Sequence, residues 1–131
     1  MLEIRNEQMD VLEKAVVEAY IAELVSHFRR SVPSRVSAMP DRALAEFCRR
    51  GVSRAREYGL DDRWDMCRFI GFQLLCGEAF ELTAPGAWAL ETLRDEALNP
   101  TERMDYMDYY YVRVLGQHLE EDPGPSVPRQ D

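Results

Sequence analysis

MCRFIGFQLLC (Met66–Cys76) is the stretch that decides the fold of this chain. Nine of its eleven residues are apolar or glycine, and only Arg68 and Gln73 are polar. A helix that is apolar on nearly all sides has to be covered by other helices on most of them. We therefore expect an all-α, single-domain bundle of about five helices around a buried central helix at about residues 62–76.

Length and composition agree with a small folded domain. The chain has 131 residues, of which 46% are hydrophobic, and this is enough for one core without disulfides or metals. Its start lacks the pattern of a secretory signal peptide, and no apolar run approaches the roughly 20 residues that span a bilayer. We expect a soluble, cytoplasmic protein that does not bind membranes.

The flanking helices are predicted from caps and from apolar spacing. Asn6 resembles an N-cap for a first helix at about residues 7–31, and Asn99, Pro100 and Glu102 form a strong start signal for the last one. The inward stripe of the first helix is predicted as Met9, Leu12, Val16, Tyr20, Leu24 and Phe28. The other predicted helices lie at about 40–58, 62–76, 87–95 and 100–119.

The helical domain is expected to cover residues 1–121, and residues 122–131 form a proline-rich segment predicted to be flexible. Ile70 and Leu74 should lie at the centre of the core. Gly51 and Gly71 interrupt predicted helices at a cost of about 1 kcal/mol each relative to alanine. Each is therefore predicted to mark a place where another helix crosses closely.

Residues that could carry chemistry are few. His27 and His118 have no ligand or catalytic partner at a suitable spacing, and no GxSxG motif occurs. The odd number of cysteines does not favour disulfides or zinc and suggests buried thiols instead: Cys48, Cys67 and Cys76. We expect a protein that is not an enzyme and that has no catalytic residue, cofactor or metal.

The charge distribution is uneven. Residues 29–56 contain eight arginines and two acids, a net of +6, which leaves −14 for the rest of a chain whose net charge is −8. These arginines either dock an acidic partner or pair with acids of the first and last helices. The overall negative charge disfavours nucleic acid as a partner. The candidate docking residues are Arg49, Arg50, Arg54 and Arg56.

A second candidate surface is the tyrosine-rich start of the last helix. Four tyrosines within six residues cover more than half of the helix circumference, so some of them must be exposed. Exposed tyrosines either anchor a protein partner or close the edge of the bundle with their hydroxyls in water. The residues predicted to bind a partner are Tyr106, Tyr109 and Tyr110.

Three segments carry a resemblance to a known family: LEIRNEQMDVLE, RRGVSRAREYGL followed by DDRWDMCRFIGFQLLCGEAFE, and LNPTERMDYM. They resemble small helical proteins encoded in bacterial type VI secretion effector clusters, beside a spike protein, a PAAR-type tip or a toxic effector. The resemblance implies a non-catalytic adaptor or chaperone for a secreted effector or spike component. An immunity protein that blocks a cognate toxin is the alternative, and the negative charge suits it when the toxin is basic.

Overall fold

The computed structural model describes the backbone of residues 2–115 and the side chains of residues 13–113. Every regular element in this part of the chain is helical, which confirms the all-α class. Six α-helices occur where about five were expected, because the short second helix was not predicted. The helices are α1 (Leu2–Ser31), α2 (Pro33–Val36), α3 (Asp41–Glu57), α4 (Arg63–Cys76), α5 (Ala87–Leu93) and α6 (Pro100–Tyr110), with a 3-10 turn at Phe80–Leu82 and a π-helical turn at Tyr111–Leu115.

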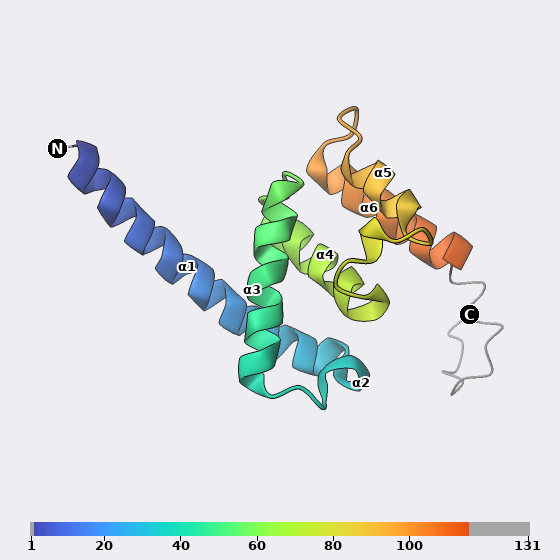
Figure 1. Ribbon diagram of the computed structural model, residues 1–131, viewed down its shortest axis with the longest axis horizontal. Helices are drawn as coiled ribbons and strands as arrows, with labels where there is room; N and C mark the ends of the chain where they lie inside the picture. The colour runs from blue at the N-terminus through green and yellow to red at the C-terminus, as the bar shows by residue number, and fades with distance from the viewer. Residues whose placement is uncertain (1, 116–131) are drawn as a thin grey trace.

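Helix α4 lies at the centre of the bundle, as predicted, between α3 and α6 (Figure 1). Asp62 caps it, because its carboxylate accepts hydrogen bonds from the backbone N–H groups of Trp64 and Asp65 at 3.0 and 3.2 Å. Ile70 is fully buried, but Leu74 is only half-buried. Burial decreases along the last turn of α4, where Cys76 is exposed, so the prediction of three buried thiols is wrong for this cysteine.

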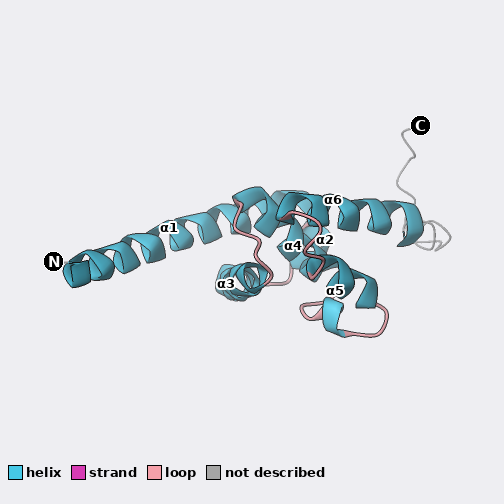
Figure 2. Cartoon of the chain, turned by 90° about the horizontal axis from the view of Figure 1, so that it is seen from above, coloured by secondary structure: helices cyan, strands magenta, loops and turns pink. Residues whose placement is uncertain are grey.

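Helix α1 joins the bundle with its C-terminal half only. Tyr20, Leu24 and Phe28 are buried there, as the predicted stripe requires. The N-terminal half extends away from the other helices (Figures 1 and 2), and Val16 is 66% exposed, so its predicted inward position is wrong. The helix also begins before Asn6, which is therefore an interior residue and not a cap.

The two helical glycines have different environments. A Cβ atom at Gly51 would lie 2.6 Å from Cγ1 of Ile70 and 2.7 Å from Oε1 of Gln73, so α3 and α4 do cross closely there. A Cβ atom at Gly71 would lie 3.8 Å from Cε1 of Phe28, an ordinary van der Waals distance. The predicted close crossing at Gly71 is therefore wrong.

Helix α6 begins with the capping box that the sequence predicts, in which Asn99 and Glu102 each accept a hydrogen bond from the backbone N–H of the other. Met104 and Met107 are fully buried. The predicted end of this helix near residue 119 and the tail at 122–131 lie outside the described residues. No helix in the described part of the chain is long and apolar enough to cross a membrane.

Candidate protein-binding surface

Four of the five arginines of α3 project toward carboxylates of neighbouring segments. Arg49 donates from Nη2 and Nε to the two carboxylate oxygens of Glu18 on α1, at 2.8 and 2.9 Å. Arg50 makes the same kind of two-bond contact with Glu78, at 2.6 and 3.2 Å. The hydrogen bond from Arg50 is the main cause of a lowered Glu78 pKa. Both arginines therefore stabilise contacts within the molecule.

Arg54 belongs to a more buried contact. Its guanidinium donates to Oε2 of Glu81 at 3.1 Å, and the hydroxyl of Tyr58 donates to the same oxygen at 2.7 Å. The Glu81 side chain has no exposed surface. Burial, together with the hydrogen bond to Glu81, raises the pKa of Tyr58 to about 12. The Arg54–Glu81 ion pair joins the Phe80–Leu82 turn to α3.

The remaining candidate arginine, Arg56, pairs with Glu13 at 3.0 Å on the extending part of α1. All four candidate arginines thus have a carboxylate partner inside the chain. Glu13 and Glu18 lie on the first helix, as the internal-pairing alternative expected, but Glu78 and Glu81 lie between α4 and α5 and not on the last helix. Three other arginines of residues 29–56 are exposed and form no ion pair with a described carboxylate. These are Arg30, Arg35 and Arg42, at the corner where α1, α2 and α3 meet.

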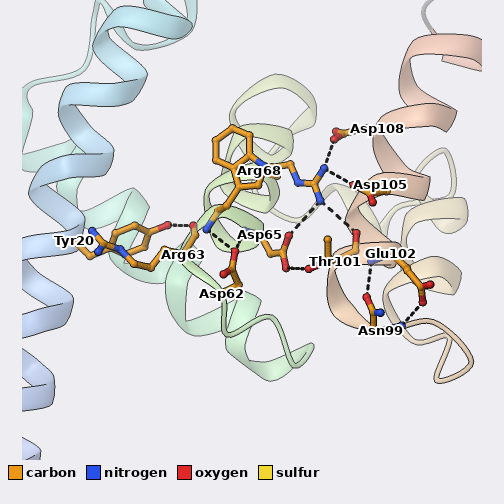
Figure 3. A network of polar contacts seen from close by, with 11 residues as sticks. Tyr20, Asp62, Arg63, Asp65, Arg68, Asn99, Thr101, Glu102, Asp105 and Asp108 are labelled. Atoms are coloured by element: carbon orange, nitrogen blue, oxygen red, sulfur yellow. Dashed lines mark hydrogen bonds and ion pairs between the residues drawn. The ribbon is translucent and has the colours of Figure 1, made fainter.

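A polar network fixes α6 on α4 and so sets the direction of the tyrosines (Figure 3). Arg68 donates to Asp105 at 2.9 Å, to Asp108 at 2.7 Å and to Asp65 at 3.2 Å. The hydroxyl of Thr101 donates to the buried Asp65 at 2.8 Å. Desolvation raises the pKa of Asp108, although Arg68 opposes this effect. The acids among the tyrosines are therefore partly neutralised within the fold.

The predicted tyrosines divide into an exposed and a packed pair. Tyr106 and Tyr109 are 53% and 59% exposed. The ring of Tyr110 stacks on that of Trp88 from α5, with centroids 4.5 Å apart and an interplanar angle of 18°. Tyr111 packs edge-on against Phe72 with centroids 5.5 Å apart. Helix α6 thus presents two tyrosines to solvent, while Tyr110 at its end and Tyr111 in the following π-helical turn pack against α5 and α4.

Tyr106 forms one wall of a groove between α5 and α6. The groove has a volume of about 290 Å³. We name it the α5–α6 groove, and its lining residues are Trp88, Glu91, Thr92, Asp95, Leu98 and Tyr106. The Thr92 hydroxyl donates to the backbone oxygen of Trp88 at 2.9 Å. The two groove carboxylates, Glu91 and Asp95, take part in none of the ion pairs found among the described side chains. The groove is therefore lined by aromatic and acidic side chains, and none of the described residues that line it is a cation.

Of the residues that line this groove, the sequence pointed only to Tyr106. It gave Trp88, Glu91 and Asp95 no role in binding. The sequence does contain a signal for the groove, because Trp88 and Glu91 are three positions apart and therefore share one helix face. Trp64, at the start of α4, was also missed, although it is 59% exposed.

A wider depression of about 830 Å³ is lined by Arg54, Tyr58, Leu82, Arg94 and Arg103 among others. Arg103 is held there by the backbone oxygens of Tyr58 and Asp95, each at 3.0 Å. No group of three His, Cys, Asp or Glu in the described residues could hold a metal ion. Of the two histidines, His118 lies outside those residues.

Comparison of the chain with protein-family models, with curated proteins and with solved structures finds no match. The resemblance to accessory proteins of type VI secretion therefore stays a prediction from the sequence.

Proposed function

We propose that this chain is a non-catalytic protein-binding factor, an adaptor or chaperone for a type VI secretion effector or spike component in the bacterial cytoplasm. The observation that carries the proposal is the half-exposed Tyr106 beside a groove whose two carboxylates form no ion pair with a described residue. The resemblance of the sequence supplies the secretion context.

The chemistry of the groove favours binding of a protein. Tyrosine and tryptophan are enriched among residues that dominate protein interfaces, because each combines a large apolar area with a polar tip. Carboxylates at the rim of such a surface attract a basic partner and speed its association. The α5–α6 groove combines Trp88 and Tyr106 with Glu91 and Asp95, and Arg68 of α4 holds α6, which supplies Tyr106.

The test is capture of the partner from the native host with the wild-type chain, with identification of proteins encoded by neighbouring genes. A Tyr106→Ser/Glu91→Gln variant should lose the partner. Trp64→Ala is the matched control, since Trp64 is as exposed as Tyr106 but lines a different groove. It should retain the partner.

The proposal requires that the captured protein is an effector or spike component and that a captured toxin keeps its activity in the complex. A toxin that is inactive when bound would identify an immunity protein instead, the role that the net charge of −8 also suits. Binding that is unaffected by the Tyr106→Ser/Glu91→Gln variant would exclude the α5–α6 groove as the binding surface.

A further inference from the structure

The chain itself shows how an aromatic residue and an acid on one helix turn bind arginine. On α1, Tyr20 and Glu23 are three positions apart. The guanidinium of Arg63 lies 5.1 Å from the centroid of the Tyr20 ring and forms an ion pair with Glu23. A ring face attracts a cation at this distance, and the carboxylate adds a charge-assisted hydrogen bond.

Helix α5 repeats this arrangement without an arginine. Trp88 and Glu91 have the same three-residue spacing, and both line the α5–α6 groove. Asp95 adds a second carboxylate, and Tyr106 adds a second aromatic side chain from α6. Neither Trp88 nor Tyr106 has an arginine over its ring among the described residues. One face of the Trp88 ring is covered by Tyr110, so the groove offers a cation the remaining surface of Trp88, the Tyr106 side chain and two carboxylates.

We propose that the α5–α6 groove binds an arginine side chain from a basic segment of the partner protein. The proposal deepens the proposed function, on which it rests, by specifying the chemistry of the bound segment. The guanidinium would lie against Trp88 and Tyr106 and donate to Glu91 and Asp95.

Size and charge support this occupant. The groove volume of about 290 Å³ is at the lower limit of ligand pockets, which run from about 300 to 1,000 Å³, so the groove suits one side chain better than a whole small molecule. A guanidinium is planar, stacks on aromatic rings and offers several donors to carboxylates. The ammonium of lysine offers a point charge without the flat face, so arginine should be preferred.

The chain has two tryptophans, which makes a direct test possible. The indole N–H signals of Trp88 and Trp64 are followed by NMR in the full chain during titration with the peptide acetyl-Gly-Ser-Arg-Ser-Gly-amide. The same peptide with lysine or citrulline in place of arginine serves as a probe of charge and shape. The protein variants are Glu91→Gln and Asp95→Asn, and the control is Glu96→Gln, an exposed acid that does not line this groove.

The arginine peptide should shift the Trp88 signal to saturation and leave that of Trp64 in place. Lysine should bind about threefold more weakly, and citrulline, which is neutral, should not bind. Glu91→Gln should weaken binding about fivefold, as loss of one ion pair with an aromatic neighbour implies, while Glu96→Gln should not change it. Asp95→Asn keeps a side-chain oxygen that can accept the hydrogen bond from the backbone N–H of Ala97, so a loss of peptide affinity in this variant is due to the lost negative charge.

The arginine proposal is overturned if Trp88 does not shift, if citrulline shifts it equally, or if Glu96→Gln weakens binding as much as Glu91→Gln. If the arginine proposal fails in one of these ways but capture of the partner still depends on Tyr106, the proposed protein-binding function stands. If partner capture does not depend on Tyr106 while the arginine peptide still binds, the groove keeps its arginine site but is excluded as the surface that binds the partner.

Discussion

Replacing Gly51 by alanine tests the crossing of α3 and α4. The new methyl group would lie 2.6 Å from Cγ1 of Ile70 and 2.7 Å from Oε1 of Gln73, well inside the optimal separation of about 3.5–4.0 Å between carbon atoms. Ile70 is fully buried and Gln73 is 2% exposed, so neither side chain can move into solvent. Relief of the clash therefore requires movement of the helices or of the Gln73 side chain.

The expected change in the free energy of unfolding combines one stabilising effect with two destabilising ones. Alanine in place of glycine stabilises a helix by about 0.5–1 kcal/mol. Overpacking a well-packed site costs about 1–3 kcal/mol. A shifted Gln73 would also weaken its 2.9 Å hydrogen bond to the backbone oxygen of Glu78, which is worth about 1 kcal/mol. Gly51→Ala should therefore destabilise the protein by about 1–3 kcal/mol.

Gly71→Ala is the matched control in the neighbouring helix. Its Cβ atom would lie 3.8 Å from Cε1 of Phe28, so the substitution should be neutral or stabilise by up to about 1 kcal/mol. Both free energies of unfolding are measured by urea denaturation followed by circular dichroism, with the m-value as a check on two-state behaviour. A Gly51→Ala variant as stable as the wild type, or a Gly71→Ala variant that loses more stability, would refute the geometry of the crossing.

Three further predictions concern buried and paired groups. Arg54→Met leaves the buried Glu81 carboxylate without its cation, so it should lower the free energy of unfolding more than Arg49→Met does. The loss should stay below the about 3–5 kcal/mol expected when a fully buried pair is broken, because Arg54 is 34% exposed, and urea denaturation of both variants measures it. Arg50 lowers the pKa of Glu78 below 4.5, so this pair stabilises the fold above that pH, and its contribution is lost as the pH falls through the lowered value. Glu78→Gln should cost up to about 1 kcal/mol at pH 7 and progressively less as the pH is lowered below 4.5, and a cost that does not change with pH would contradict the pairing. Burial raises the thiol pKa of Cys48 to about 12 and of Cys67 to about 11, so only the exposed Cys76 should react with a thiol reagent at pH 7.5 in the folded protein. More than one reactive thiol per folded chain would contradict the burial of Cys48 and Cys67.

The helices were predictable where local signals and burial agree. Met66–Cys76 must be covered because it is apolar on most sides, and Asn99 with Glu102 satisfies backbone groups that any helix start exposes. Val16 was misplaced because its spacing fits the stripe of Tyr20 and Leu24, yet periodicity does not say where a long helix leaves the bundle.

The surface was predictable only in part, for a different reason. Four tyrosines within six residues require exposed members, and Tyr106 and Tyr109 are exposed. The pairing of Arg49 with Glu18, 31 residues away, depends on how α1 and α3 cross, and the number of arginines in the sequence does not reveal that crossing. The same is true of the α5–α6 groove, because the contact of Trp88 with α6 is set by tertiary packing.

The most direct test of the central claim is the affinity of the purified chain for its captured partner, measured by calorimetry with the wild type, Tyr106→Ser, Glu91→Gln/Asp95→Asn and Glu96→Gln. The account predicts that the first two variants weaken binding about tenfold or more, as expected for an interface anchor, while Glu96→Gln leaves it unchanged. Wild-type affinity should also fall as salt rises. Equal affinity of all four proteins would contradict the assignment of the α5–α6 groove as the binding surface.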